Sequence, residues 1–374
     1  MDGEPSARAP ALPGRHSDYY EARGNQPLLD GQRRYRYPSS KEKNLGKLVA
    51  LSTVLALAAI SANPAVTAAP RPPVLSLERT LPLAPGLGRV DHMAADLRRG
   101  RLFVAELGSG AVEEVDLASG RSVGRIGGLK EPQGIGYLPE RDELVVASGG
   151  DGSVRFYRGS DLSPVGVLPL GEDADNVRID PRGRVVVGFG SGALAIIDPA
   201  TRRVVAKIEL PAHPESFQID GDRAFVNLPD AGKIAVVDFA KGKVITTWEN
   251  PDVRWNFPMA FDRASNTLAV VYRFPARLLI FDASSGRVIQ RLETCGDSDD
   301  VFFDPARRRI YVSCGAGMID VFERTGTTFS RAARIPTRPG ARTSLFSVAS
   351  DRLWVAARGG PAQAPVVLIF KPSP

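Results

Sequence analysis

Acidic, amide and histidine side chains that could bind a cation or move a proton recur in seven short segments of the sequence. The candidate ligand-binding residues are Asp91, His92, Gln133, Asp175, Asn176, Arg178, Glu215, Asn256, Asp299, Asp300, Arg342 and Thr343. Oxygen ligands from carboxylates and amides suit hard cations such as Ca²⁺ or Mg²⁺. The candidate metal ligands of this kind are Asp175, Asn176, Glu215, Asn256 and Asp299. Three interpretations stay open: a solvated polar surface, a metal-free site for a small ligand or partner, and a metal site.

His92 is the candidate catalytic residue, because an imidazole that titrates near neutral pH can act as a general base. Asp91 precedes it, and a carboxylate could orient the ring. Adjacent residues on a strand point to opposite faces, so we expect the orienting acid to come from another part of the fold. A structural role for this histidine is the alternative. The sequence shows no haem, phosphate-loop or zinc-protease motif, so it predicts no particular reaction.

A repeat of about 40 residues determines where these side chains lie. An apolar run that ends in Asp and is followed by a turn and a basic residue recurs as EEVDLASGR, AIIDPATRR, AVVDFAKGK and LIFDASSGR. With three weaker copies, the anchor positions are Asp116, Tyr157, Asp198, Asp238, Asp282, Glu323 and Lys371, at steps of 41, 41, 40, 44, 41 and 48 residues. The recurring Asp is predicted to accept N–H groups of the following turn and to have a structural role.

Each unit contains short β-branched runs bounded by Gly, Pro, Asn or Asp, which is typical of antiparallel strands joined by turns. In the first unit these runs are VDHMAAD, RLFVAEL, AVEEVDL and SVGRIGG. Seven units of four strands predict an all-β, seven-bladed β-propeller over residues 74–374. The last unit lacks a fourth strand, and we expect residues 74–81 to supply it and close the ring.

The candidate residues lie in the segments that lead into the first strand of each unit. In a propeller the innermost strands begin at one face of the central channel, so these side chains are expected to converge there as a polar funnel. Carboxylates held this close repel each other unless water, arginine or a cation compensates. Replacing Asp175, Glu215 or Asp299 with the neutral amide is therefore expected to leave the fold intact or to stabilise it slightly.

The repeat pattern resembles that of the YVTN-repeat, YncE-like secreted seven-bladed β-propellers of bacteria. The segments that carry the resemblance are RVDHMAAD, EPQGIGY, DADNVRID, HPESFQID, NFPMAFD, DSDDVFFD and ARTSLFSV. The resemblance implies an exported protein that binds a small ligand or a protein partner, and it implies no single reaction. The alternative, by analogy alone, is a metal-dependent hydrolase or lyase of the gluconolactonase type, which holds a cation with Glu, Asn and Asp oxygens.

The N-terminal region is predicted to direct export. Three lysines precede an apolar run at 48–62, and Val66-Thr67-Ala68 offers small residues for cleavage. The run is shorter than the roughly 20 residues of a membrane span. We expect residues 1–40 to be disordered or to lie upstream of the true start, 41–68 to be a signal peptide and 69–73 a linker. The mature protein would be periplasmic or extracellular, and an uncleaved membrane anchor is the alternative.

The charge balance bears on the partners. The 48 Lys and Arg residues against 42 Asp and Glu give a net charge of +6 over 374 residues, without the basic clusters that nucleic-acid binding needs. We therefore expect no nucleic-acid partner, no membrane span after signal cleavage, and a monomer.

The two cysteines of the chain, Cys295 and Cys314, are a candidate disulfide. If Phe303 lies opposite Ile310 across a hairpin, Asp299 falls opposite Cys314. Cys295 would then lie on a loop that can fold back within the Cα separation of about 7 Å that a disulfide permits. An oxidising compartment outside the cytoplasm would allow the bond.

Overall fold

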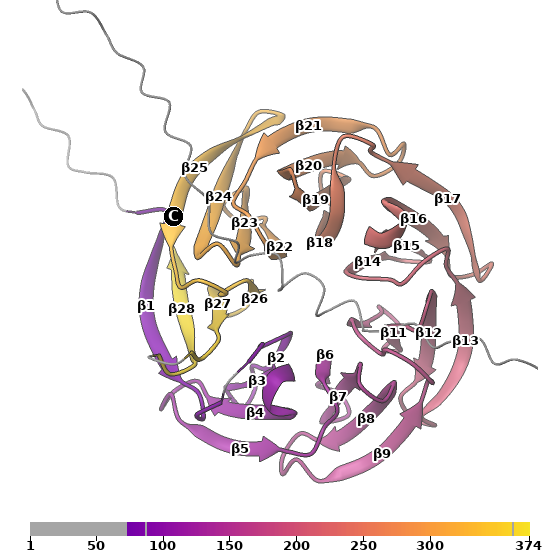
Figure 1. Cartoon of the computed structure of the whole chain (residues 1–374), viewed down its shortest axis with the longest axis vertical. Helices are drawn as coiled ribbons and strands as arrows, with labels where there is room; N and C mark the ends of the chain where they lie inside the picture. The colour runs from indigo at the N-terminus through magenta and orange to yellow at the C-terminus, as the bar shows by residue number, and fades with distance from the viewer. Residues whose placement is uncertain (1–72, 87, 361–362) are drawn as a thin grey trace, which may run out of the picture. The chain divides into compact units, whose positions relative to one another are not determined.

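The computed structural model of the chain describes residues 73–86, 88–360 and 363–374. The predicted extension at 1–40, the signal peptide at 41–68 and residues 69–72 of the linker lie outside these ranges. The described part contains 28 β-strands in seven four-stranded antiparallel sheets. The sheets stand around a central axis, each with its first strand near the axis and its last strand at the rim (Figure 1). The predicted all-β, seven-bladed propeller is confirmed.

The first four blades follow the sequence order, with each strand hydrogen-bonded to the next. Blade 1 contains β2 (Met93–Asp96), β3 (Arg101–Glu106), β4 (Ala111–Asp116) and β5 (Ser122–Ile126). Blade 2 contains β6 (Pro132–Leu138), β7 (Glu143–Ser148), β8 (Ser153–Arg158) and β9 (Pro164–Pro169). Blade 3 contains β10 (Val177–Ile179), β11 (Val185–Phe189), β12 (Ala193–Asp198) and β13 (Arg203–Glu209). Blade 4 contains β14 (Phe217–Asp220), β15 (Arg223–Leu228), β16 (Lys233–Asp238) and β17 (Lys243–Glu249).

The last three blades complete the ring. Blade 5 contains β18 (Arg254–Asp262), β19 (Thr267–Phe274), β20 (Ala276–Asp282) and β21 (Val288–Glu293). Blade 6 contains β22 (Ser298–Asp304), β23 (Arg309–Cys314), β24 (Met318–Thr325) and β25 (Thr328–Pro336). Blade 7 contains β26 (Thr343–Ser347), β27 (Arg352–Ala357), β28 (Val366–Pro372) and β1 (Leu75–Pro82). Two 3₁₀ turns, η1 (Leu107–Ser109) and η2 (Pro229–Ala231), join strands, and no helix of the described part is long and apolar enough to cross a membrane.

Apolar side chains pack between neighbouring blades. Val145 and Phe156 of blade 2 form one buried core with Val177 and Val187 of blade 3. The middle strands are buried on both faces, which explains why their sequences are continuous β-branched runs instead of alternating apolar and polar residues. The core is therefore complete without the polar side chains of the lead-in segments.

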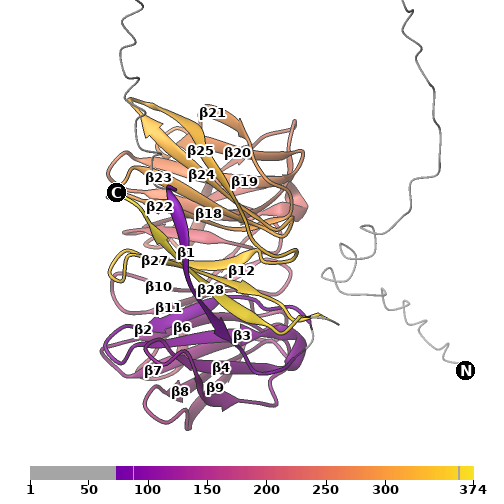
Figure 2. The same ribbon diagram turned by 90° about the vertical axis from the view of Figure 1, so that its left-hand side faces the viewer.

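The N-terminal strand closes the ring, as predicted. β1 pairs antiparallel with β28 from Leu75, opposite Pro372, to Pro82, opposite Val366. Figure 2 shows the two strands side by side. Leu75 and Leu81 are fully buried in two different inter-blade cores. This pairing joins the two ends of the propeller through backbone hydrogen bonds and apolar packing.

The Asp that ends the third strand of several blades has the predicted structural role. In blade 1 the Ser119 N–H donates to Asp116 Oδ1 at 2.7 Å, and in blade 3 the Ala200 N–H donates to Asp198 Oδ1 at 2.9 Å. These carboxylates cap the turns between the third and fourth strands, at the face opposite the lead-in segments.

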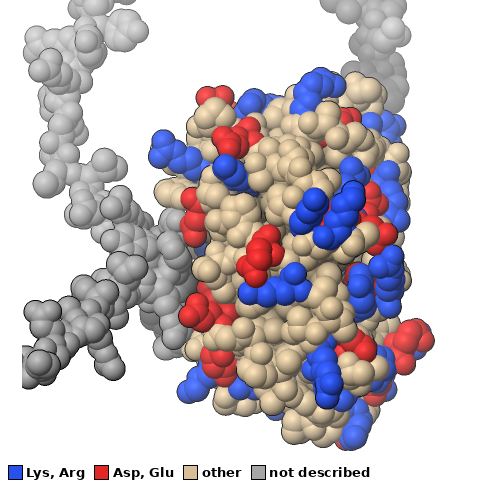
Figure 3. Space-filling model, turned by 90° about the vertical axis from the view of Figure 1, so that its right-hand side faces the viewer, with Lys and Arg blue, Asp and Glu red and all other residues tan. Residues whose placement is uncertain are grey.

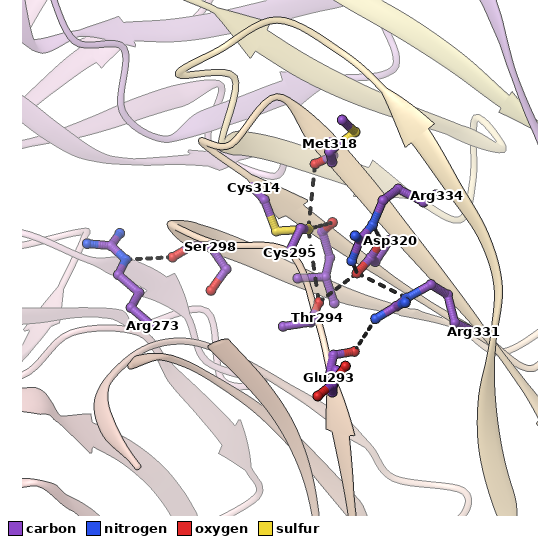
Figure 4. Close-up of a disulfide and its surroundings, with 11 residues drawn as sticks. Arg273, Glu293, Thr294, Cys295, Ser298, Cys314, Met318, Asp320, Arg331 and Arg334 are labelled. Carbon is purple, nitrogen blue, oxygen red and sulfur yellow. Dashed lines mark hydrogen bonds and ion pairs between the residues drawn. A yellow bond between two sulfur atoms is a disulfide. The ribbon is translucent and has the colours of Figure 1, made fainter. Parts of the chain in front are cut away.

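Cys295 and Cys314 form a disulfide, with their Cα atoms 5.9 Å apart (Figure 4). Both cysteines are buried in the core between blades 5 and 6. Beside them, the buried carboxylate of Asp320 accepts hydrogen bonds from Arg334 at 2.6 and 2.7 Å. The bond fixes the segment that leads into β22 to the end of β23.

The expected register of blade 6 holds only in part. Phe303 lies opposite Ile310, as expected, but Ser298 and not Asp299 lies opposite Cys314. A β-bulge between Ser298 and Asp300 shifts the register by one residue and leaves Asp299 without a ladder partner. Bulges re-aim side chains, and this one directs Asp299 toward arginines of the two neighbouring blades.

Candidate functional site

Three acidic residues occupy the same backbone position just before the innermost strands of different blades. The N–H groups of Asp91, Asp175 and Glu215 each donate to a carbonyl of the second strand of their own blade, at 2.8, 2.9 and 3.0 Å. The acceptors are Ala105, Gly188 and Asn227. Because this backbone geometry repeats around the ring, the three carboxylates are rigidly placed at the same end of the axis.

The polar side chains that meet at this end of the axis come from six of the seven blades. We call them the axial cluster. Its members are Arg89, Asp91, His92, Asp175, His213, Glu215, Arg273, Asp299 and Arg342. Acidic and basic groups are not evenly matched within it, and this imbalance determines what the cluster can bind.

Asp299 is the most fully compensated carboxylate of the cluster. Arg273 of β19 donates to its Oδ1 at 2.5 Å, and Arg342 approaches its Oδ2 at 3.1 Å. Arg273 also donates to the Ser298 carbonyl (Figure 4). Its guanidinium carbon lies 3.8 Å from the centre of the Phe257 ring. Burial opposes ionisation of Asp299, but the two arginines outweigh it and hold its pKa below the usual range. Asp299 is therefore an anion already held between two cations.

Asp91 is paired as well, and its side chain approaches His92 without forming a hydrogen bond with it. Arg89 lies 2.8 Å from Asp91 Oδ2, while His92 Nε2 lies 3.7 Å from Asp91 Oδ1 and 4.0 Å from Asp175 Oδ1. The two adjacent side chains do approach each other, because β2 begins only at Met93 and the strand alternation does not apply before it. Burial lowers the pKa of His92, which favours the neutral imidazole.

Asp175 and Glu215 have no arginine at ion-pair distance among the described residues. Together with His213 they offer ligand atoms that lie within 4.8 Å of one another. Burial, followed by the neighbouring charge of Glu215, raises the pKa of Asp175 well above the usual range. Burial, followed by Asp299, raises the pKa of Glu215 to about 8. Arg273 and Arg89 oppose the shift of Glu215 only from a distance, so within the described part this side of the cluster has no arginine in direct contact with a carboxylate.

Arg178 and Asp300 lie next to the cluster. Arg178 donates to the Val177 carbonyl at 2.9 Å and lies over the Phe217 ring, 5.6 Å from its centre. Asp300 accepts the Ser344 N–H at 2.6 Å. Burial lowers the pKa of Arg178, while the charge of Asp300 opposes that shift. These two predicted residues influence each other's charge, but they form no ion pair in the described part.

Other predicted residues join blades instead of facing the cluster. Asn256 is fully buried and donates to Asn227 Oδ1 and to the Lys233 carbonyl, both at 2.9 Å. Thr343 donates to the Val90 carbonyl at 3.1 Å and links blade 7 to blade 1. Of the predicted ligands for Ca²⁺ or Mg²⁺, Asn256 uses its Nδ2 atom in the contact between blades 4 and 5, while its Oδ1 atom has no hydrogen-bond partner in the described part. Asp299 is held by two arginines.

Two amide residues border the cluster. Gln133 Nε2 donates to Asp173 Oδ1 at 3.4 Å. Asn176 follows Asp175 and is buried, and its Oδ1 atom makes no hydrogen bond with a described residue. Among the described residues, neither side chain forms a hydrogen bond with a carboxylate of the axial cluster.

The cluster contains residues that the sequence pattern did not identify as ligands. Arg273 is the penultimate residue of β19, the second strand of blade 5, whereas the predicted residues all lie in lead-in segments. The signal in the sequence that could have identified it is a charged residue near the end of the otherwise apolar run TLAVVYRF. His213 stands two residues before Glu215 in a lead-in segment, and Arg89 stands two residues before Asp91. This spacing places both partners on the same short stretch of backbone.

The rim of the propeller has a different character. On the side that Figure 3 shows, Lys and Arg are interspersed with Asp and Glu instead of forming a patch of one sign. The charge pattern of this side therefore points to no partner, and the unequal distribution of charge at the axis is the more informative feature.

Comparison with known proteins establishes the fold alone. No protein-family model and no curated protein sequence matches the chain. Among solved structures, a chain of hydrazine synthase from Kuenenia stuttgartiensis is similar with 17% identity and a TM-score of 0.65, covering 73% of this chain and 93% of that one. A chain of the mitotic checkpoint complex is similar with 15% identity and a TM-score of 0.67, covering 86% of this chain and 99% of that one. At such low identity, these similarities concern architecture and carry no function.

Proposed function

We propose that this chain is an exported propeller of the YVTN-repeat, YncE-like type that binds a small ligand carrying positive charge at the axial cluster. The observation that supports the proposal is the uneven compensation of the carboxylates. Asp91 and Asp299 have arginine partners, whereas Asp175 and Glu215 have none within ion-pair distance in the described part. A cationic group placed between these two would supply the charge that is lacking.

The energetics favour a binding role over a structural one. Burying a carboxylate without a partner opposes folding, and the inter-blade cores are complete without these side chains. Asp175 and Glu215 are nevertheless fixed by backbone hydrogen bonds of the blade ladders. A site that is destabilising when empty and rigidly positioned is well suited to binding, because little order has to be gained when the ligand arrives.

An aromatic surface at the same end of blade 5 adds to the site. Phe274 follows Arg273 and is 59% exposed, and its ring centre lies 6.0 Å from that of Trp255. Strand pairing of Arg254 with Phe274 places these rings at the end of the blade where the lead-in segment enters. A ligand with a planar or apolar part could contact these rings while its charged group reaches the axis.

A thermal-shift screen of the purified protein against small amines, amino acids and amino sugars tests this function. A compound that raises the melting temperature of the wild type should have no effect on Asp175→Asn. Glu172→Gln is the matched control, because Glu172 is an exposed acid on the same loop, and it should respond as the wild type does. A compound that stabilises all three proteins equally would contradict binding at the axial cluster.

Export is part of the same proposal. The disulfide is compatible with an oxidising compartment, and the predicted signal peptide would place cleavage after Ala68. N-terminal sequencing of protein from the native cell tests this: a mature chain that begins near Ala69 supports export with cleavage. A chain that retains residues 41–68 in the membrane fraction would support the anchored alternative.

A metal-dependent hydrolase or lyase is the second candidate function. It is favoured by the grouping of Asp175, His213 and Glu215. It is also favoured by His92, whose pKa is lowered by burial and whose Nε2 atom lies 4.0 Å from Asp175 Oδ1. A screen of lactone and ester substrates with and without added metal ions tests it. Turnover that is lost in His92→Gln would support an enzyme, and ligand binding without turnover would leave the binding function.

A further inference from the structure

We infer that Asp175, His213 and Glu215 bind a divalent transition metal ion, with Zn²⁺ as the first candidate. This rests on the proposed function and names the cation that the site takes. One ring nitrogen of His213, one carboxylate oxygen of Asp175 and one carboxylate oxygen of Glu215 lie within 4.8 Å of one another. Asp175 comes from the segment before β10, and the other two come from the segment before β14. The site thus bridges blades 3 and 4.

His213 is held as a metal-binding histidine is usually held. Its Nδ1 atom lies 2.6 Å from the carbonyl oxygen of Gly190, in the turn between β11 and β12. A carbonyl can only accept, so Nδ1 carries the proton and Nε2 keeps its lone pair. Metal-ligating histidines commonly donate their other ring N–H in this way, which fixes the tautomer and the ring orientation.

Asp175 supplies an independent sign that a ligand belongs here. Its side chain is only 9% exposed, and its Oδ1 atom is buried without a hydrogen bond to any described residue. Buried polar atoms almost always have a partner, and the Asp175 carboxylate supplies one of the three possible ligand atoms of this group. A metal ion would give this carboxylate the partner that it lacks.

The donor types select the metal. Ca²⁺ and Mg²⁺ prefer sites made of oxygen alone, whereas a site that combines imidazole with carboxylates suits Zn²⁺, Mn²⁺ or Fe²⁺. The presence of His213 therefore replaces the expected hard cation with a transition metal. Three protein ligands leave a coordination position of Zn²⁺ open to water or to an electron-pair donor.

The test is a metal titration of the full protein after treatment with chelator and dialysis. Calorimetry with Zn²⁺ and the visible absorption of added Co²⁺ should both show one bound ion per chain. Asp175→Asn, Glu215→Gln and His213→Gln should each weaken Zn²⁺ binding by at least about tenfold. Glu172→Gln should bind Zn²⁺ as the wild type does. Circular dichroism and a thermal melt establish that each variant is folded.

The inference is overturned if the wild type binds none of Zn²⁺, Co²⁺ and Mn²⁺, if the three ligand variants bind Zn²⁺ as the wild type does, or if Ca²⁺ or Mg²⁺ binds more tightly than Zn²⁺. The His213→Gln variant separates this inference from the proposed function, because a cationic organic ligand needs the two carboxylates and not the imidazole. A ligand that still binds His213→Gln and chelated wild type would leave the proposed function standing without the metal. Zn²⁺ binding with no small-molecule hit in either state would support the metal site and contradict the ligand.

Discussion

The Oδ1 atom of Asp175 lies 4.0 Å from Nε2 of His92, although the two residues belong to blades 3 and 1, which are not neighbours in the ring. Only blade 2 lies between these blades, so the two side chains meet in front of its inner edge. Residues about 80 positions apart in the sequence thus contribute to one group of polar side chains at this end of the axis. A ligand that enters from this face encounters these groups directly.

Asp175→Asn should stabilise the metal-free protein by about 0.5–1 kcal/mol. The substitution removes a buried carboxyl group whose ionised form is disfavoured by burial and repelled by Glu215 and Asp91, and it keeps the shape of the side chain. Urea unfolding in the presence of chelator measures the change in free energy. A loss of stability of similar size would mean that the carboxylate is structural.

Asp299→Asn should have the opposite effect and destabilise the protein by about 1–3 kcal/mol, because Arg273 and Arg342 would lose their less exposed anion and keep only the more exposed Asp297. This differs from the expectation based on sequence, in which all funnel carboxylates repel each other. Glu249→Gln is the control, since that residue forms an exposed pair with Lys233 and should leave unfolding unchanged. Equal effects of the two substitutions would contradict a buried, compensated Asp299.

Asp300 should make stability depend on pH. Burial, followed by the charge of Asp299, raises its pKa well above the usual range, so the native state keeps a proton that the unfolded chain releases. This contribution is complete below about pH 4 and is lost as the pH rises toward the pKa of the folded state. Between about pH 4 and pH 7, the free energy of unfolding of Asp300→Asn should therefore decline less with pH than that of the wild type. Parallel pH profiles would refute this assignment.

The closing strand should be sensitive to core substitutions on one face only. Leu81 is 1% exposed and packs between blades 7 and 1, so Leu81→Ala should cost about 2–4 kcal/mol. Leu77 is 54% exposed on the same strand, and Leu77→Ala should have little effect. Thermal or urea unfolding distinguishes the two. Similar losses for both variants would argue against the observed register of β1.

Reduction of the disulfide should destabilise the protein by about 3 kcal/mol, the value expected when a loop of this size is no longer closed in the unfolded chain. Cys295 and Cys314 are separated by 19 residues. A thiol titration of denatured, non-reduced protein should find no free thiol, and unfolding with and without reductant gives the free-energy difference. Two titratable thiols under these conditions would show that the bond is absent.

The fold could be predicted from the sequence because the information is local and repeated. The Asp-turn-basic motif recurs at nearly constant spacing, and β-branched runs between turn residues identify four strands in each unit. The closure by residues 74–81 could also be predicted by counting strands. The seventh unit contains only three strands, and the strand at 74–81 precedes the first unit. The same counting placed the polar lead-in segments together at one end of the axis.

Only the tertiary structure decided which of these polar residues act together. Asp175, Glu215 and Asp299 look equivalent in sequence, but a β-bulge and Arg273 compensate Asp299 and leave the other two without an arginine partner in the described part. Asn256 looked like a ligand and joins two blades instead. Such differences depend on contacts between side chains of different repeat units, which lie about 40 residues or more apart in the sequence. Spacing along one chain determines which residues reach the axis, but not which of them meet there.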